Sequence, residues 1–185
     1  MRIVRLSHMN YRHYILGLII CLSSFSCRKQ QPELFEIDMF FDINIPVGLN
    51  TIEDHFFIIE DVPNFYAAQL SVNGFVEADV DRILGATGVF TTRVSGLNLD
   101  IIADMGIHVL DKEDPSIRKE LLYVFGDQIP FGTKTEIPLI GSIVNVKDYF
   151  NEETVDLELK INFRGFATEQ IDGRVQFKLI AYGDE

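Results

Sequence analysis

The sequence predicts an all-β fold built from antiparallel strands, with one or two short helices. Apolar and polar residues alternate along three segments, residues 36–47, 155–164 and 174–181. Phe40 and Ile180 are the apolar exceptions on the polar side of this alternation. A period of two places successive side chains on opposite faces of a strand. One apolar and one polar face are typical of antiparallel sheets, because parallel strands are covered on both faces and read as continuous apolar runs.

Further strands are expected between turn-forming residues, at 55–61, 104–111, 119–126 and 134–140. Short helices are expected at 63–69, where a proline stands in the first turn, and at 146–151. Residues 75–102 stay ambiguous between strand and short helix. Many short strands with few helices favour an antiparallel immunoglobulin-like β-sandwich. A closed antiparallel barrel is the alternative.

The N-terminus has the three-part layout of a secretory signal peptide. Residues 1–13 carry three arginines and no acid, residues 14–22 are uninterrupted apolar, and residues 23–26 are mostly small. A membrane-spanning helix needs about 20 apolar residues to cross about 30 Å. The apolar run here would cover only about 14 Å as a helix. We therefore expect a signal peptide at 1–26, a tether at 27–34 and one domain at 35–185.

Cys27 is the expected lipidation site. Ser24-Phe25-Ser26-Cys27 resembles a lipobox, in which a small residue precedes the lipidated cysteine, although Ser24 stands where leucine is usual. Ordinary signal peptidase also accepts small residues at these positions, so cleavage without lipidation is the alternative. Removing residues 1–26 removes Cys21 and leaves Cys27 alone. A single thiol cannot form an internal disulfide in an exported domain, which favours its use as a lipid acceptor.

The whole pattern resembles uncharacterised cell-envelope lipoproteins of Gram-negative bacteria, which pair a lipobox with one immunoglobulin-like β-sandwich. The motif that carries this resemblance is the lipobox around Cys27. The resemblance implies a protein held at the outer membrane by its acylated cysteine. Arg28-Lys29 directly after the cysteine differs from the acidic tags of some surface-exported lipoproteins, which favours the periplasmic side.

The charge of the chain argues against nucleic acid as a partner. The sequence holds 28 acidic and 16 basic residues, with a formal net charge of −12. Nucleic-acid binding requires clustered Lys and Arg, and the longest basic run is Arg28-Lys29. Loss of three arginines with residues 1–26 makes the mature charge −15. Such a surface is repelled by anionic headgroups, so the lipid is expected to hold the protein at the membrane.

The sequence offers no convincing catalytic set, metal site or cofactor motif, so we expect a protein that is not an enzyme. The mature chain has two histidines, His55 and His108, far apart in sequence. The acidic cluster 77–81 lacks the closing glutamate of a calcium loop and is interpreted as a solvated acidic face, and the cluster 111–114 is interpreted as an ordinary acidic turn before Pro115. No Gly-x-Ser-x-Gly motif is present.

These observations favour a non-catalytic accessory or structural subunit of a cell-envelope assembly, with an envelope protein as its partner. Phe40 and Ile180, apolar residues on otherwise polar strand faces, are the candidate interface. The alternative is a glycan- or small-ligand-binding module. The absence of tryptophan weakens the glycan alternative, and the four mature tyrosines are interpreted as core-edge residues: Tyr66, Tyr123, Tyr149 and Tyr182.

Overall fold

A computed structural model describes residues 31–94, 97–126, 128–129, 132 and 135–184. The predicted signal peptide and Cys27 lie outside these residues. Residues Gln31–Asp184 form one compact unit. Its strands are β1 (Glu33–Ile45), β2 (His55–Pro63), β3 (Val80–Thr92), β4 (Ile102–Leu110), β5 (Arg118–Val124), β6 (Glu136–Gly141), β7 (Thr154–Phe163) and β8 (Ile171–Gly183). The helical elements are α2 (Tyr66–Asn73) and three short 3₁₀ turns at Glu77–Asp79, Leu99–Ile101 and Lys147–Phe150.

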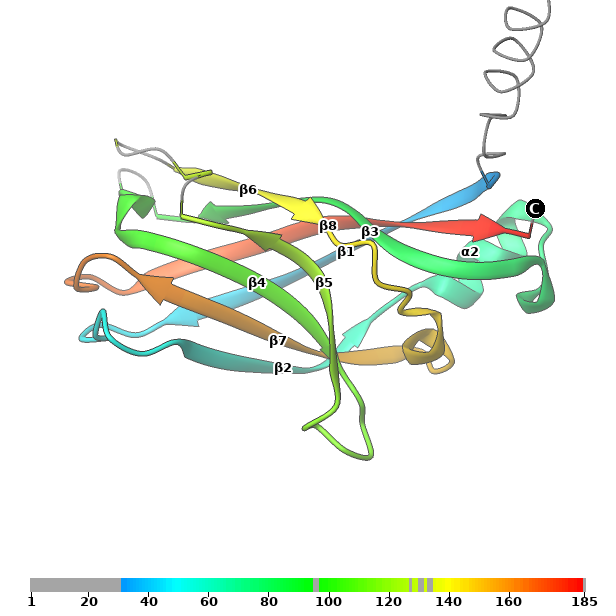
Figure 1. The fold of residues 1–185 in the computed structure, drawn as a ribbon, viewed down its shortest axis with the longest axis horizontal. Coiled ribbons are helices and arrows are strands. Elements are labelled where there is room, and N and C mark those ends of the chain that lie inside the picture. The colour runs from blue at the N-terminus through cyan, green and yellow to red at the C-terminus, as the bar shows by residue number, and fades with distance from the viewer. Residues whose placement is uncertain (1–30, 95–96, 127, 130–131, 133–134, 185) are drawn as a thin grey trace, which may run out of the picture. The chain divides into compact units, whose positions relative to one another are not determined.

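All strand pairs are antiparallel, in the order β1-β8-β3-β6-β5-β4-β7-β2. We call β1, β8, β3 and β6 the β8 half, and β5, β4, β7 and β2 the β4 half. Among the described residues, the ladder between β5 and β6 that joins the halves has two residue pairs, Leu122–Gly141 and Tyr123–Ile140. In Figure 1 the two halves run on different sides of the domain, with α2 near one end. The predicted antiparallel all-β fold is confirmed.

The observed strand order differs from that of an immunoglobulin sheet. In an immunoglobulin sheet the first strand lies next to the second. Here β1 pairs with β8 and β2 pairs with β7, so the first two strands lie at opposite ends of the strand order. Alternation within a strand fixes which face is buried but does not select the partner strand, which depends on contacts between distant parts of the chain.

The predicted helices are shifted or shortened. Strand β2 continues to Pro63, and α2 begins only at Tyr66, because the buried Asn64 side chain accepts a hydrogen bond from the Tyr66 backbone N–H. The helix ends before Gly74, whose left-handed backbone is favourable for glycine. The second predicted helix is the single 3₁₀ turn Lys147–Phe150. Within the described residues, no helix is long and apolar enough to cross a membrane.

The ambiguous segment 75–102 contains the long strand β3, with a short 3₁₀ turn on each side of it. Strand β3 spans thirteen residues, and its register with β8 shifts at Val80/Arg82 and at Gly85/Thr87. Each shift moves the following side chains relative to the two faces, so the strand loses its simple alternation. This bulged geometry explains why a period of two is not visible in its sequence.

The core contains the inward side chains of both halves. On β1 and β7 the buried residues follow the predicted alternation, except that Glu158 on the polar side of β7 is also buried, and both strands contribute to a single apolar cluster. Phe90 of β3 and Phe163 of β7 are among the largest fully buried side chains. Where the halves meet, Gly85 and Gly141 bring backbones together: a Cβ on Gly141 would lie 2.1 Å from the Gly85 carbonyl oxygen. Any side chain here would force the strands apart.

Candidate functional site

The predicted interface residues, Phe40 and Ile180, lie on neighbouring strands but are not cross-strand partners. Strand β1 pairs with β8, so the expected proximity of the two strands is correct. Phe40 lies opposite Gln176, whereas Ile180 lies opposite Glu36. Lys178 stands between these two positions on β8 and forms an ion pair with Glu36. The interface itself stays a prediction, and charged side chains lie between Phe40 and Ile180.

Phe40 lines an open hollow on the outer face of the β8 half. Its side chain is 52% exposed, and the Arg174 guanidinium lies 5.1 Å from the centre of its ring. The hollow has a volume of about 540 Å³ and is also lined by residues of β3 and β8, including Val89 and Gln176. This is the part of the predicted interface with room for a partner's side chain.

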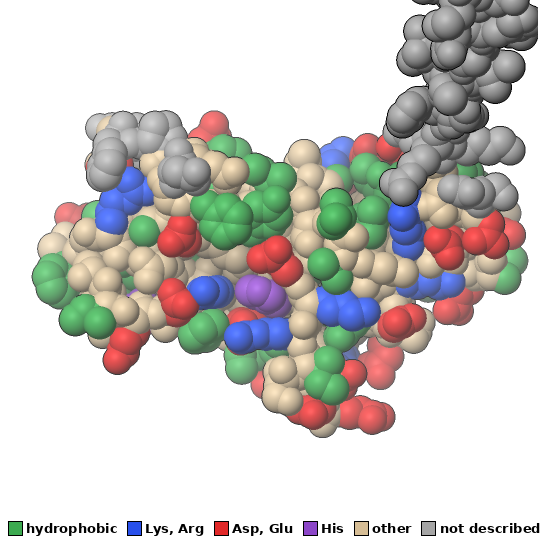
Figure 2. Space-filling view, in the orientation of Figure 1, with side chains coloured by type: hydrophobic (Ala, Val, Ile, Leu, Met, Phe, Trp, Pro, Cys, Tyr) green, Lys and Arg blue, Asp and Glu red, His purple; other side chains and the backbone are tan. Residues whose placement is uncertain are grey.

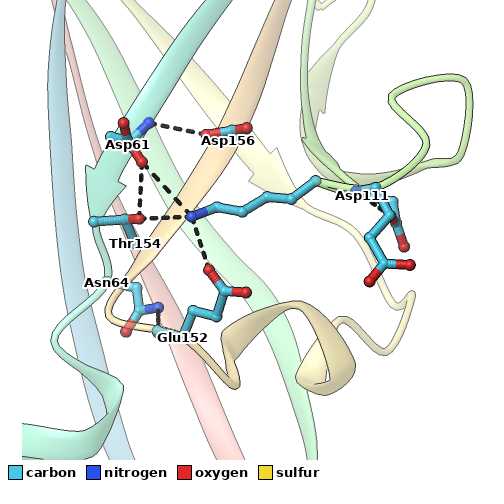
Figure 3. Close-up of polar contacts among 8 residues, drawn as sticks. Asp61, Asn64, Asp111, Glu152, Thr154 and Asp156 are labelled. Carbon is cyan, nitrogen blue, oxygen red and sulfur yellow. Dashed lines mark hydrogen bonds and ion pairs between the residues drawn. The ribbon is translucent and has the colours of Figure 1, made fainter.

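A cluster of polar side chains around Lys112 joins the β4–β5 loop to β2 and β7 (Figure 3). The Lys112 ammonium donates hydrogen bonds to Glu152 at 3.0 Å and to Thr154 at 2.8 Å, and it lies 3.6 Å from an Asp61 carboxylate oxygen. Thr154 donates to the same Asp61 oxygen at 3.1 Å. These contacts hold the loop against the sheet edge, and Glu152 raises the pKa of Lys112 through its hydrogen bond.

The acidic residues near this lysine are accounted for by backbone contacts. The Asp111 side chain accepts hydrogen bonds from the backbone N–H groups of Glu113 and Asp114, and these bonds shape the β4–β5 loop. Asp61 adopts a left-handed backbone with φ of 54°, and Asp156 accepts its N–H. Among the described residues, no group of three or more His, Cys, Asp or Glu side chains is arranged to hold a metal ion. This group is interpreted as a structural clasp.

The outer face of the β4 half carries a row of ionisable residues at its centre. His108 on β4 lies directly opposite Glu120 on β5 and Glu158 on β7. Arg118 donates a hydrogen bond of 2.7 Å to Glu158, whose side chain is only 9% exposed. The Arg118 guanidinium also lies 5.4 Å from the centre of the Phe56 ring. The Glu158 charge is therefore held by a cation that itself packs on an aromatic ring.

His108 lies close to Glu158 without a hydrogen bond to it. The two groups are separated by 3.6 Å between Nδ1 and Oε1, which is too long for a hydrogen bond. Nδ1 is buried and has no partner within the described residues. Burial lowers the pKa of His108, although the Glu158 carboxylate acts in the opposite direction. Burial raises the pKa of Glu120, although the positive charge of Lys160 acts in the opposite direction. The site thus disfavours charge on both His108 and Glu120.

A small cavity lies beside this row, above Gly106. In the next cross-strand row Gly106 lies between Tyr123 on β5 and Lys160 on β7, and it has no side chain to fill the space. The cavity has a volume of about 100 Å³ and is lined by Asp104, Met105, Gly106, His108, Glu120, Tyr123, Val124, Phe125 and Lys160. Figure 2 shows hydrophobic, acidic, histidine and basic side chains gathered on this face of the domain.

Two aromatic rings border the cavity. The Tyr123 and Phe125 ring centres lie 5.0 Å apart, and Phe125 is 55% exposed. Sequence reasoning placed His108 on a polar strand face but did not connect it to Glu120, and it assigned Tyr123 to the edge of the core. The spacing Gly106-x-His108 was visible in the sequence. The residues opposite it, however, follow from a register that shifts at Ile107/His108.

We expect the histidine to make folding pH-dependent. Because burial lowers the folded-state pKa of His108, the unfolded chain takes up a proton first as the pH falls below about 6.5. The free energy of unfolding should therefore fall between pH 7 and the folded-state pKa. In urea titrations His108→Gln should weaken this dependence relative to the parent, in a Cys27→Ala background that lacks the lipid acceptor. If His108→Gln and the parent show the same dependence of the free energy of unfolding on pH, the buried His108 is not its source.

No protein-family model matches the sequence, and no curated protein matches it at a significant level. Among solved structures, the chain aligns with a chain of the empty head of turnip yellow mosaic virus. The identity is 9%, the alignment covers 99% of this chain and 90% of that chain, and the TM-score is 0.26. A score this low carries no argument about fold or function. The function is therefore argued from the residues of this chain.

Proposed function

We propose that the protein is a non-catalytic lipoprotein, held at the outer membrane by an acylated Cys27, that acts as an accessory or structural subunit of a cell-envelope assembly. The observation that carries this proposal is the short distance between the anchor and the fold. Strand β1 begins at Glu33, the sixth residue after Cys27. Six residues span at most about 20 Å. A domain tied this closely would meet partners at the bilayer surface.

The hollow beside Phe40 is the proposed contact for an envelope protein partner. It combines an exposed aromatic side chain with an open volume, the features that mark protein interfaces. The acidic surface of the mature chain would not be drawn to anionic lipid, so the acyl chains supply the membrane affinity. The periplasmic side is proposed for the domain, because Arg28-Lys29 differs from acidic surface-export tags.

For the fold, we propose a two-layer sandwich of the jelly-roll kind in place of the immunoglobulin kind. A jelly roll packs eight antiparallel strands into two sheets through nested long connections. The order β1-β8-β3-β6 followed by β5-β4-β7-β2 supports this proposal, because each half alternates early and late strands of the chain. The short ladder between β5 and β6, with two residue pairs in the described part of the chain, supports treating the halves as two layers.

The anchor is tested by replacing Cys27 with alanine. The wild-type protein should fractionate with membranes and have an intact mass that exceeds the mature chain by its acyl groups. Cys27→Ala should be soluble after the membranes are removed, because the anchor residue is lost. Cys21→Ala is the matched control and should stay with membranes. A soluble, unmodified wild-type protein would overturn the proposal.

A second function, the binding of a glycan or another small ligand, is favoured by the cavity above Gly106. The cavity places unpaired polar groups beside an exposed aromatic ring, as in many ligand sites. A ligand that binds only the folded state raises the melting temperature. A thermal-shift panel of soluble glycans tests this function, and a panel with no stabilising member would count against it.

A further inference from the structure

We propose that the cavity above Gly106 receives the edge of a neutral sugar residue, whose ring lies against Phe125. This inference deepens the second function proposed above and rests on it. The cavity volume of about 100 Å³ is close to that of about three water molecules. It therefore holds one or two hydroxyl groups of a sugar, while the rest of the sugar stays outside.

The floor of the cavity exists because residue 106 is glycine. Its cross-strand neighbours Tyr123 and Lys160 have long side chains that stand on either side of it. A Cβ on residue 106 would lie 3.3 Å from Cε1 of His108, so even alanine would press on the histidine ring. A single methyl group would therefore both raise the floor and disturb one wall.

The polar walls suit hydroxyl groups, which both donate and accept hydrogen bonds. Glu120 makes no hydrogen bond or ion pair with another described residue, so its carboxyl group can accept from a ligand. Nδ1 of His108 is buried, so a ligand would use the other ring nitrogen, which in a neutral histidine is either a donor or an acceptor. Together these residues offer matched partners for adjacent hydroxyls on one sugar ring.

The charges around the cavity disfavour ionic ligands. The two nearby cations already have carboxylate partners: Lys160 lies 2.7 Å from Asp54, and Arg118 lies 2.7 Å from Glu158. An anion would therefore meet the carboxyl groups of Glu120 and Asp104 without a free cation to balance it. A small cation would find the Asp104 carboxylate already accepting from the Gly126 backbone N–H, and among the described residues no group of three or more His, Cys, Asp or Glu side chains is arranged to hold a metal ion. A neutral polyhydroxylated ligand avoids both conflicts.

Phe125 supplies the apolar surface for the sugar ring. The C–H groups on one face of a sugar ring are apolar and pack on aromatic rings. Phe125 is 55% exposed, and its contact with Tyr123 helps to hold the ring beside the cavity. The exposed aromatic ring provides apolar contact area for a weakly bound sugar, and the neighbouring polar side chains fix its orientation.

The test uses the mature chain carrying Cys27→Ala, labelled with ¹⁵N and titrated with D-glucose, D-galactose, D-mannose and N-acetyl-D-glucosamine. At least one sugar should shift the amide signals of Gly106, His108 and Phe125. Gly106→Ala and Phe125→Ala should each weaken binding by about tenfold or more. Phe166→Ala is the matched control, because Phe166 is also exposed, at 66%, and does not line the cavity. The dispersion of the spectrum reports whether each variant is folded.

The outcomes separate the site from the function. If a sugar binds and Phe125→Ala and Gly106→Ala bind it equally well, the proposed site is wrong while the glycan-binding function stands. If none of the sugars binds, the second function fails together with the inference. Phosphate and methylammonium are the charged probes, and a shift of the cavity signals with either one but with no sugar would overturn the ligand class.

Discussion

Replacing Phe90 with alanine is expected to lower the free energy of unfolding by about 3 to 5 kcal/mol. Phe90 is fully buried on β3, and its ring covers Gly173 of the neighbouring strand β8. A Cβ on Gly173 would lie 2.3 Å from Cε2 of Phe90, so the ring occupies the space that a side chain at 173 would fill. Alanine at position 90 would leave a cavity at this contact that the rigid sheet cannot close.

The change should be measured by urea denaturation of the Cys27→Ala protein, monitored by circular dichroism. Phe166→Ala removes the same number of atoms from a phenylalanine that is 66% exposed. It should alter the free energy of unfolding by no more than about 0.5 kcal/mol. Equal effects for the two variants would mean that Phe90 is not part of the core.

Replacing Arg118 with glutamine is expected to lower the free energy of unfolding by about 1 to 3 kcal/mol. Glu158 is 9% exposed and would lose the cation that donates to it at 2.7 Å. A carboxylate left in a buried position without its partner loses solvation that nothing replaces. The effect stays below the extreme for buried pairs, because the Arg118 side chain is itself 44% exposed.

The matched control for Arg118 is an exposed ion pair on the other half of the domain. Lys178 pairs with Glu36, and the two side chains are 47% and 56% exposed. Lys178→Gln should alter the free energy of unfolding much less than Arg118→Gln does, because solvent screens an exposed pair. Urea titrations at pH 8 compare the two variants. A larger effect for Lys178→Gln would contradict the view that burial makes Glu158 depend on Arg118.

Most strands were predictable because each is a local pattern, whereas the bulged strand β3 was not. In β1, and in β7 apart from the buried Glu158, the burial of alternate side chains follows the sequence directly. The partner of each strand was not predictable in this way. The pairing of β1 with β8 joins residues more than a hundred positions apart, and it depends on how the whole chain packs. This is why an immunoglobulin-like order was expected and a different order is found.

The candidate site was hidden from the sequence for the same reason. Gly106 and His108 lie on one strand, but Glu120 and Glu158 reach them from two others. The register shift next to His108 decides which residue of β5 faces it, and such shifts leave no clear trace in the sequence. Phe40, by contrast, was found from its sequence, because an aromatic residue on a polar strand face is a local anomaly.

The most direct test of the proposed function is affinity purification of the tagged protein from its own membranes in detergent, compared with Cys27→Ala by mass spectrometry. We expect the wild-type protein to be lipidated and to co-purify with a membrane protein in stoichiometric amount, whereas Cys27→Ala should be soluble and should purify without that partner. Phe40→Asp, which keeps the lipid, should lose the same partner. A wild-type protein that is isolated alone, or that carries no lipid on Cys27, would contradict the proposed function.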